Sequence, residues 1–146
     1  MKTIILYYSK HHGNTRRLLE AIAEKTPVEM IDVAVDGGRD LSEYDRIGLA
    51  SGVYAGNLGK PLLKYAEEHL PQGKQVFYIY TSAGTQESAL TKIRRIADSK
   101  GCREIGTYYS RGFNTFGPTK LFGGTSKGHP TKEELDGAAA FYAALK

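Results

Sequence analysis

Three short segments of the sequence combine small residues with hydroxyl, amide or imidazole groups, and each directly follows an apolar run. The first consists of Ser9, Lys10, His11, His12, Gly13, Asn14 and Thr15. Ser9 and Thr15 offer hydroxyl groups, and Gly13 allows a ligand to approach the backbone closely. A helical pattern follows, and the free N–H groups at a helix N-terminus form an anion site. The segment therefore predicts a phosphate-binding loop, against the alternative of a plain strand-to-helix turn.

The spacing within this first segment narrows the kind of phosphate ligand. No lysine stands in a G-K-[ST] arrangement, which argues against a nucleoside triphosphate, and no G-x-G-x-x-G pattern favours a dinucleotide. A phosphate monoester held by neutral donors fits better. A phosphatase that needs Cys-x5-Arg is also excluded, as is a phosphoacceptor domain, because Tyr8, Ser9 and Ser51 stand where acidic residues would be required.

The other two segments follow later apolar runs. One contains Ser51, Gly52, Val53, Tyr54, Ala55, Gly56 and Asn57, and the other contains Thr81, Ser82, Ala83 and Gly84. In an open parallel sheet, ligands bind outside the carboxyl ends of the strands. We therefore expect all three segments to lie at one edge of the sheet and to form a single site, with no catalytic side chain and no metal ligand among them.

The elements that must position these segments alternate between strand-like and helix-like patterns. The expected strands are Thr3–Tyr8, Val28–Val33, Asp45–Ser51, Gln75–Tyr80 and Cys102–Gly112. The expected helices are Gly13–Lys25, Lys60–Leu70, Gln86–Lys100 and Thr131–Leu145, the last beginning with a capping box formed by Thr131 and Glu134. The connection Val33–Tyr44 has no helical pattern. This alternation predicts an α/β protein, a three-layer doubly wound sandwich with a parallel sheet.

The first segment also carries a family resemblance. Gly13, Asn14 and Thr15, placed between an apolar strand and an amphipathic helix, resemble the end of the phosphate loop of flavodoxins. The resemblance implies a single domain over residues 1–146, a five-stranded parallel sheet of order 2-1-3-4-5, and FMN as the cofactor. His11 and His12 stand where that family more often has threonine or serine. We expect at least one of them to contact the phosphate, against the alternative that both are merely exposed.

The same resemblance gives roles to the other two segments. The segment from Ser51 resembles the loop along the isoalloxazine ring, so Tyr54 would pack on that ring and the Gly56–Asn57 backbone would face flavin N5. The segment from Thr81 resembles the loop whose backbone N–H groups reach the pyrimidine oxygens. It has no aromatic residue before Gln86. The second face of the flavin is therefore open or is covered from Phe113–Pro130, whose rings Phe113, Phe116 and Phe122 have core packing as their alternative role.

The charge is unevenly distributed along the 146 residues, which carry a formal net charge of +4. Residues 74–146 hold 11 Lys and Arg against 6 Asp and Glu, whereas residues 1–73 hold 9 against 10. This basic excess predicts redox protein partners with acidic docking surfaces, unless it is only a solvated helix face. No nucleic-acid-binding motif is present in the sequence, so we expect no nucleic-acid partner.

Taken together, these features predict an electron-transfer protein that passes electrons between a reductase and an acceptor protein through FMN. The alternatives are a flavin-dependent oxidoreductase acting on a quinone or similar small acceptor, and a module that keeps the fold without flavin. The single cysteine, Cys102, excludes an internal disulfide and favours a small buried strand residue over a nucleophile. No apolar run has the length of a membrane span, and we expect a cytoplasmic protein.

Overall fold

The computed structural model describes residues 1–9, 13–82, 87–111 and 130–145. The strands are β1 (Thr3–Tyr8), β2 (Glu29–Asp32), β3 (Arg46–Tyr54), β4 (Asn57–Leu58), β5 (Gln75–Ser82) and β6 (Arg103–Arg111). The helices are α1 (Asn14–Lys25), α2 (Lys60–His69), α3 (Thr91–Ser99) and α4 (Lys132–Ala144), with a 3₁₀ turn η1 (Glu87–Leu90) before α3.

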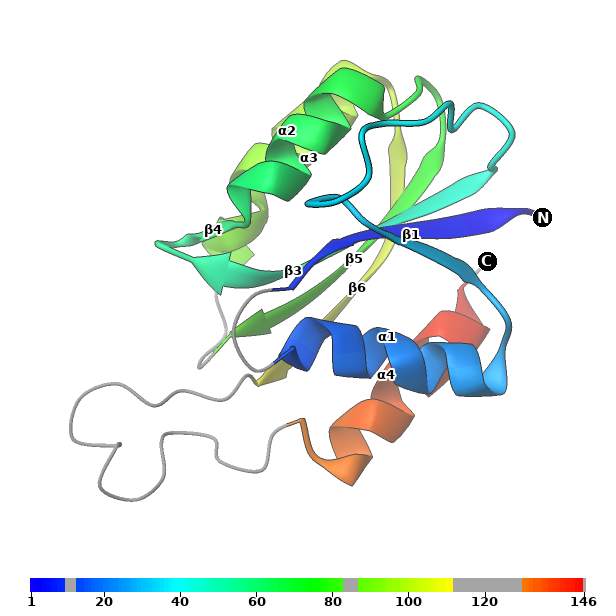
Figure 1. Cartoon of the computed structure of the whole chain (residues 1–146), viewed down its shortest axis with the longest axis vertical. Coiled ribbons are helices and arrows are strands. Elements are labelled where there is room, and N and C mark those ends of the chain that lie inside the picture. The colour runs from blue at the N-terminus through cyan, green and yellow to red at the C-terminus, as the bar shows by residue number, and fades with distance from the viewer. Residues whose placement is uncertain (10–12, 83–86, 112–129, 146) are drawn as a thin grey trace.

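The sheet has the order β2-β1-β3-β5-β6, and every pair along this path is parallel. The two-residue β4 pairs only with β3, so the order is the predicted 2-1-3-4-5 arrangement of five long strands. Helices α1 and α4 cover one face of the sheet, and α2 and α3 cover the other (Figure 1). The predicted three-layer architecture is confirmed.

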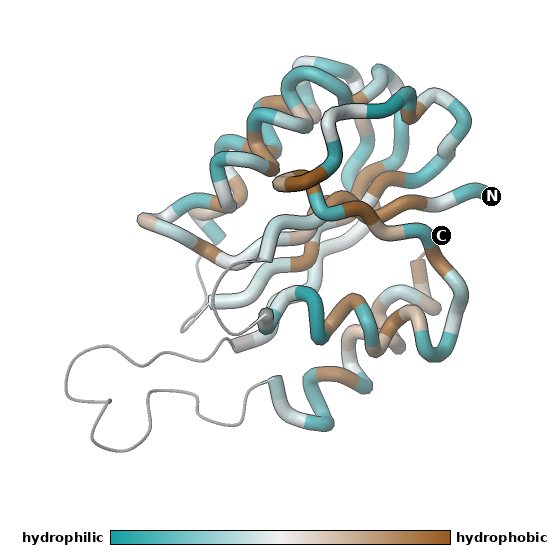
Figure 2. The backbone as a smooth tube through the Cα atoms, in the orientation of Figure 1, coloured by the Kyte–Doolittle hydropathy of each residue, from teal (hydrophilic) through white to brown (hydrophobic). Residues whose placement is uncertain are grey.

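The central strand β1 is buried on both faces, as its continuous apolar sequence predicts. Ile4 and Leu6 belong to the core on the side of α2 and α3, whereas Ile5 and Tyr7 belong to the core on the side of α1 and α4. The alternation follows from the two-residue period of a strand. The helices alternate between hydrophilic and hydrophobic residues along their length (Figure 2), because each buries one stripe against the sheet.

Several predicted bounds are wrong by a few residues, and one segment is misassigned. Strand β3 continues to Tyr54 and turns into β4, so the predicted loop after Ser51 is a β-hairpin. The predicted helix Gln86–Lys100 becomes α-helical only at Thr91, since η1 first buries Ala89 and Leu90 completely. Strand β2 ends at Asp32, whose carboxylate accepts a hydrogen bond from Ala34 N at 2.9 Å and starts a turn.

The connection between β2 and β3 has no helix, as predicted. Two further aspartates, Asp36 and Asp40, accept hydrogen bonds from backbone N–H groups two residues ahead. Such Asx turns replace helical hydrogen bonds with local ones. Leu41 and Tyr44 are 1% and 2% exposed and anchor the connection in the core.

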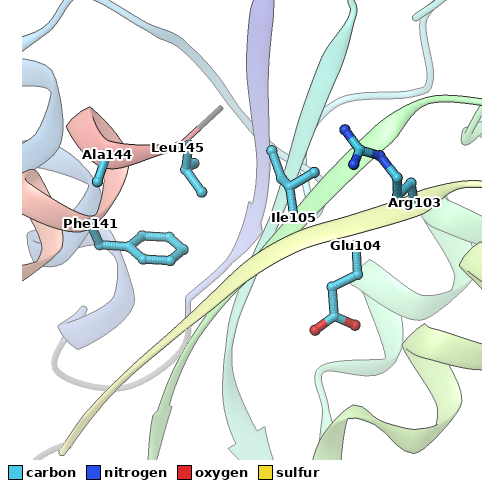
Figure 3. A pocket seen from close by; sticks show the side chains of 6 residues that line it. All are labelled: Arg103, Glu104, Ile105, Phe141, Ala144 and Leu145. Carbon is cyan, nitrogen blue, oxygen red and sulfur yellow. The ribbon is translucent and has the colours of Figure 1, made fainter.

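A pocket of about 470 Å³ lies between β6 and α4 (Figure 3). Phe141 and Leu145 line it from the α4 side, and Ile105 lines it from β6. Arg103, which begins β6, also lines it, so the pocket lies toward the amino ends of the parallel strands. It is therefore separate from the three predicted ligand segments. No helix in the described part of the chain is long and apolar enough to span a membrane.

Candidate functional site

The described residues of the three predicted segments lie at the carboxyl edge of the sheet, where β3 turns into β4 (Figure 1). The strand register places Tyr8 beside Ser51 and Gly52 beside Thr81. A buried hydrogen bond of 3.0 Å joins Thr15 Oγ1 of the first segment to Thr81 Oγ1 of the third. The expectation that the segments come together is therefore met for their described residues. The remaining predicted contacts, Lys10, His11, His12, Ala83 and Gly84, lie outside the described residues.

The N-terminus of α1 is built without a cap. Gly13, the N-cap residue, adopts a left-handed conformation with φ 61° and has no side chain that could cap the helix. The first N–H groups of a helix have no partner within the helix, and the helix dipole gives them a partial positive charge. The first turn contains no acidic residue, but it does contain Arg16 and Arg17. This arrangement suits a bound anion.

Two buried polar atoms at this helix start have no hydrogen-bond partner in the structure: Ser9 Oγ and Asn14 Oδ1. Asn14 is only 8% exposed. A buried polar atom without a partner costs about 1–3 kcal/mol, and most such atoms in folded proteins are paired. The serine hydroxyl can donate to a phosphate oxygen, whereas Asn14 Oδ1 is an acceptor and would need a donor. The Ser9 hydroxyl and the first backbone N–H groups of α1 match the neutral donors that a phosphate monoester requires.

The β3–β4 hairpin forms the second wall of the site. Val53 pairs with Leu58 and Tyr54 with Asn57. The two residues between them, Ala55 and Gly56, have φ angles of 53° and 81°. Positive φ at both positions is the mark of a type I′ turn, which glycine adopts freely and which costs alanine about 1–2 kcal/mol. The tip of the hairpin is therefore a strained, exposed turn at the edge of the candidate site.

Ser51 holds this hairpin in place. Its hydroxyl is completely buried, donates to Gly52 O at 2.7 Å and accepts from Gly59 N at 2.9 Å. Both hydrogen bonds join residues of the chain segment 51–59, which contains the hairpin. The Ser51 side chain therefore positions the hairpin, and contacts with a ligand would come from the residues that follow it.

Tyr54 and Tyr8 form an aromatic pair at the same edge. Their ring centroids lie 5.7 Å apart with an interplanar angle of 74°, an edge-to-face arrangement. Both rings line a cavity of about 300 Å³ that also borders Lys60 and Lys92. The sequence analysis treated Tyr8 only as a strand residue. Its position as the last residue of a buried strand was the signal that it would reach the binding edge.

Other chemistry is limited in the described residues. No group of three or more His, Cys, Asp or Glu side chains there is arranged to hold a metal ion. Cys102 is buried, as expected, but it lies just before β6 and not in the strand, and its thiol donates to Pro71 O at 3.3 Å. This contact gives Cys102 a packing role.

Known proteins provide a comparison with this arrangement. A family model described as a flavodoxin domain matches residues 4–104. An uncharacterised protein from Methanocaldococcus jannaschii is 31% identical over 144 residues, which cover 97% of this chain and 95% of that protein.

Solved structures with the same fold include an oxidised flavodoxin 1 from Bacillus cereus, with 14% identity, a TM-score of 0.63, and coverage of 99% of this chain and 100% of that one. A flavoprotein in complex with FMN from Lactobacillus acidophilus is 22% identical with a TM-score of 0.55, over 74% of this chain and 92% of that one. The Trp repressor binding protein from Bacillus subtilis is 15% identical with a TM-score of 0.62, over 99% and 98%. Because the family model covers more than half of its residues, the chain belongs to the flavodoxin domain family.

Proposed function

We propose that this protein binds FMN non-covalently and passes electrons between a reductase and an acceptor protein. The observation that carries the proposal is the start of α1, where the N-cap residue is a glycine and the buried Ser9 hydroxyl has no partner among the described residues. The structural neighbour from Lactobacillus acidophilus, described as a complex with FMN, supports the choice of this phosphate ester. The phosphate would lie against Ser9, Asn14 and the first backbone N–H groups of α1.

The remaining residues of the site suit the flavin ring. Tyr54 and Tyr8 supply flat apolar surface beside the 300 Å³ cavity. The hairpin places the Gly56–Asn57 backbone at its exposed tip, and Thr81 and Ser82 end β5 next to Gly52. When bound, FMN supplies one- and two-electron redox chemistry. The protein binds the cofactor, orients it and keeps water from its inner side.

A titration of the flavin-free protein with FMN and with riboflavin tests this proposal. The two ligands differ only in the phosphate, so the ratio of their affinities measures the α1 site alone. Two hydrogen bonds to a charged group contribute about 3 kcal/mol or more, which corresponds to FMN binding at least about 100-fold more tightly. Quenching of flavin fluorescence reports binding. If FMN is neither quenched nor retained on gel filtration, the cofactor is wrong, and if riboflavin binds equally well, the phosphate site is wrong.

A flavin-dependent oxidoreductase is the second candidate, because the cavity beside Tyr8 and Tyr54 has room for a small acceptor such as a quinone. Its ionisable side chains other than those two tyrosines are Lys60 and Lys92, both exposed at its rim. We therefore place the electron carrier first. Steady-state turnover of a quinone, compared with the rate of single-electron exchange with a reductase protein, separates the two functions.

A further inference from the structure

A groove of about 480 Å³ runs between α2 and α3 on the outer side of the sheet. The aliphatic side chains of Leu63 and Ile96 line it, and both are partly buried. Lys92, Arg95 and Lys100 border it on the α3 side, and Glu67 is the single acidic residue in its lining. The groove therefore combines an apolar floor with a predominantly positive rim.

The positive rim arises because Lys92 and Arg95 of α3 line the groove, whereas Arg94 of the same helix forms ion pairs away from it. Arg94 donates to Glu104 through Nε and Nη2, both at 2.9 Å, and also pairs with Glu87 at 3.5 Å. This pairing lowers the pKa of Glu104, and it directs the Arg94 guanidinium toward β6. In the described part of the chain, Lys92 and Arg95 have no ion pair. They point to the groove because residues 92, 95 and 96 share one helical face.

The groove is continuous with the candidate FMN site. Leu63 and Lys92 line both this groove and the cavity that contains Tyr8 and Tyr54. Lys60, exposed at the start of α2, adds a further positive charge to that cavity. A protein seated on the groove would therefore lie next to the edge at which the flavin is proposed to bind.

From this geometry we propose that the groove between α2 and α3 is the docking surface for an acidic redox protein. The inference rests on the proposed function, because it places the partner beside the FMN site. A polar rim around an apolar centre is the anatomy of a protein interface, and complementary charge guides the encounter. No aromatic residue lines the groove itself. Single-stranded nucleic acid binds on aromatic stacking platforms, so the lining favours a protein partner.

A matched pair of charge-reversal variants tests the docking surface. Arg95→Glu with Lys100→Glu reverses two cations of the groove, and Lys25→Glu with Arg103→Glu reverses two on the opposite face of the sheet, which α1 and α4 cover. Both variants change the net charge equally. The probe is a strongly acidic [2Fe–2S] ferredoxin, whose binding to the FMN-loaded protein is followed by surface plasmon resonance. We expect the groove variant to weaken binding at least about tenfold at low ionic strength and the control by less than about threefold.

Four further measurements make the result decisive. Arg95→Gln with Lys100→Gln, which removes charge without introducing acid, gives an intermediate loss if the groove is the interface. An equal loss in the groove and control variants, or tighter binding of a single-stranded oligonucleotide to the groove, overturns the proposal. FMN affinity, measured separately by fluorescence, stays unchanged in the groove variant. Repeating the ferredoxin titration without FMN separates a failed docking surface from a failed FMN site.

Discussion

Helices α1 and α4 lie side by side on one face of the sheet, yet their N-termini are built in opposite ways (Figure 1). At the start of α4, Thr131 Oγ1 accepts from Glu134 N at 3.1 Å and the Glu134 carboxylate accepts from Thr131 N at 2.9 Å. Acidic residues follow in its first turn. At the start of α1, the N-cap residue is a glycine, the first turn has arginines, and no side chain caps the helix.

The difference separates a structural helix start from a binding site. At the start of α4, the side chains of Thr131 and Glu134 accept hydrogen bonds from backbone N–H groups. The negative charge of Glu133 and Glu134 also complements the helix dipole. At α1 the N-cap glycine supplies no capping side chain, and the buried Ser9 hydroxyl beside it has no partner among the described residues. Most buried polar atoms in folded proteins are paired, so this helix start supports the proposed anion site.

The largest predicted effect is at the completed helix. The Glu134 carboxylate also accepts a 2.6 Å hydrogen bond from Ser110 Oγ, so it ties α4 to the buried end of β6. Glu134→Ala removes hydrogen bonds to a charged acceptor, and we expect the free energy of unfolding to fall by about 2–3 kcal/mol. Urea denaturation of the flavin-free protein measures the change.

Glu134→Gln serves as the control for this prediction, because glutamine keeps an oxygen that can accept from Thr131 N, although its NH2 group replaces the oxygen that accepts from Ser110 Oγ. It should cost less than Glu134→Ala. FMN affinity should remain within about twofold in both variants. A large loss of FMN affinity at unchanged stability would place the ligand at α4 and reverse the comparison.

The second prediction concerns the buried side-chain hydrogen bond at the start of α1. Thr15 and Thr81 are 1% and 6% exposed, and their hydroxyls are 3.0 Å apart. Thr15→Val or Thr81→Val alone leaves a buried hydroxyl without this partner and should cost about 2 kcal/mol. The double variant should cost less than the sum of the two, with a coupling energy of about 1 kcal/mol in a double-mutant cycle. Additive losses would mean that the two hydroxyls do not interact.

The comparison also shows how far the sequence alone could be interpreted. The capping box of α4 was predictable, because a threonine followed three residues later by a glutamate is a local pattern. The parallel sheet was predictable from the alternation of apolar runs and helices, and its strand order from the resemblance to flavodoxins. The partnerless state of Asn14 was not, because it depends on what the fold brings around the amide. The Thr15–Thr81 bond joins residues 66 positions apart, and no local pattern encodes it.

The hairpin and the groove illustrate the same limit. Ala55 takes positive φ, although Ala-Gly lacks the Asn-Gly or Asp-Gly signal of a type I′ turn, so Ser51–Gly59 was predicted as a loop. The basic excess of residues 74–146 counted Arg94 together with Arg95. Only the fold separates them, by placing Glu104 beside Arg94 and leaving Arg95 at the groove.

The third prediction tests the backbone at the start of α1. A Cβ at Gly13 would meet no heavy atom within 4 Å, so the cost of substitution comes from its φ of 61° alone. Gly13→Ala should lower the free energy of unfolding by about 1 kcal/mol, and Gly13→Asn by less, because asparagine tolerates this conformation. Thermal unfolding of the flavin-free variants gives the order. Equal costs for alanine and asparagine would show that Gly13 does not hold the left-handed conformation.

The smallest predicted effect compares one exposed charge from the first turn of each helix. Arg17→Gln removes a cation from the positive end of α1, so the flavin-free protein should gain about 0.3–1 kcal/mol, whereas Glu133→Gln at α4 should lose a similar amount. FMN should bind about threefold more weakly to Arg17→Gln only, because that cation lies in the helix turn at which the phosphate is proposed to bind. Urea denaturation and fluorescence titration measure the two quantities, and about 1 M salt should suppress both. If the free energy of unfolding rises in Arg17→Gln and falls in Glu133→Gln, and only Arg17→Gln binds FMN more weakly, the positive charge at the start of α1 serves a ligand. If the free energy of unfolding changes in the same direction in both variants, the two helix starts do not differ.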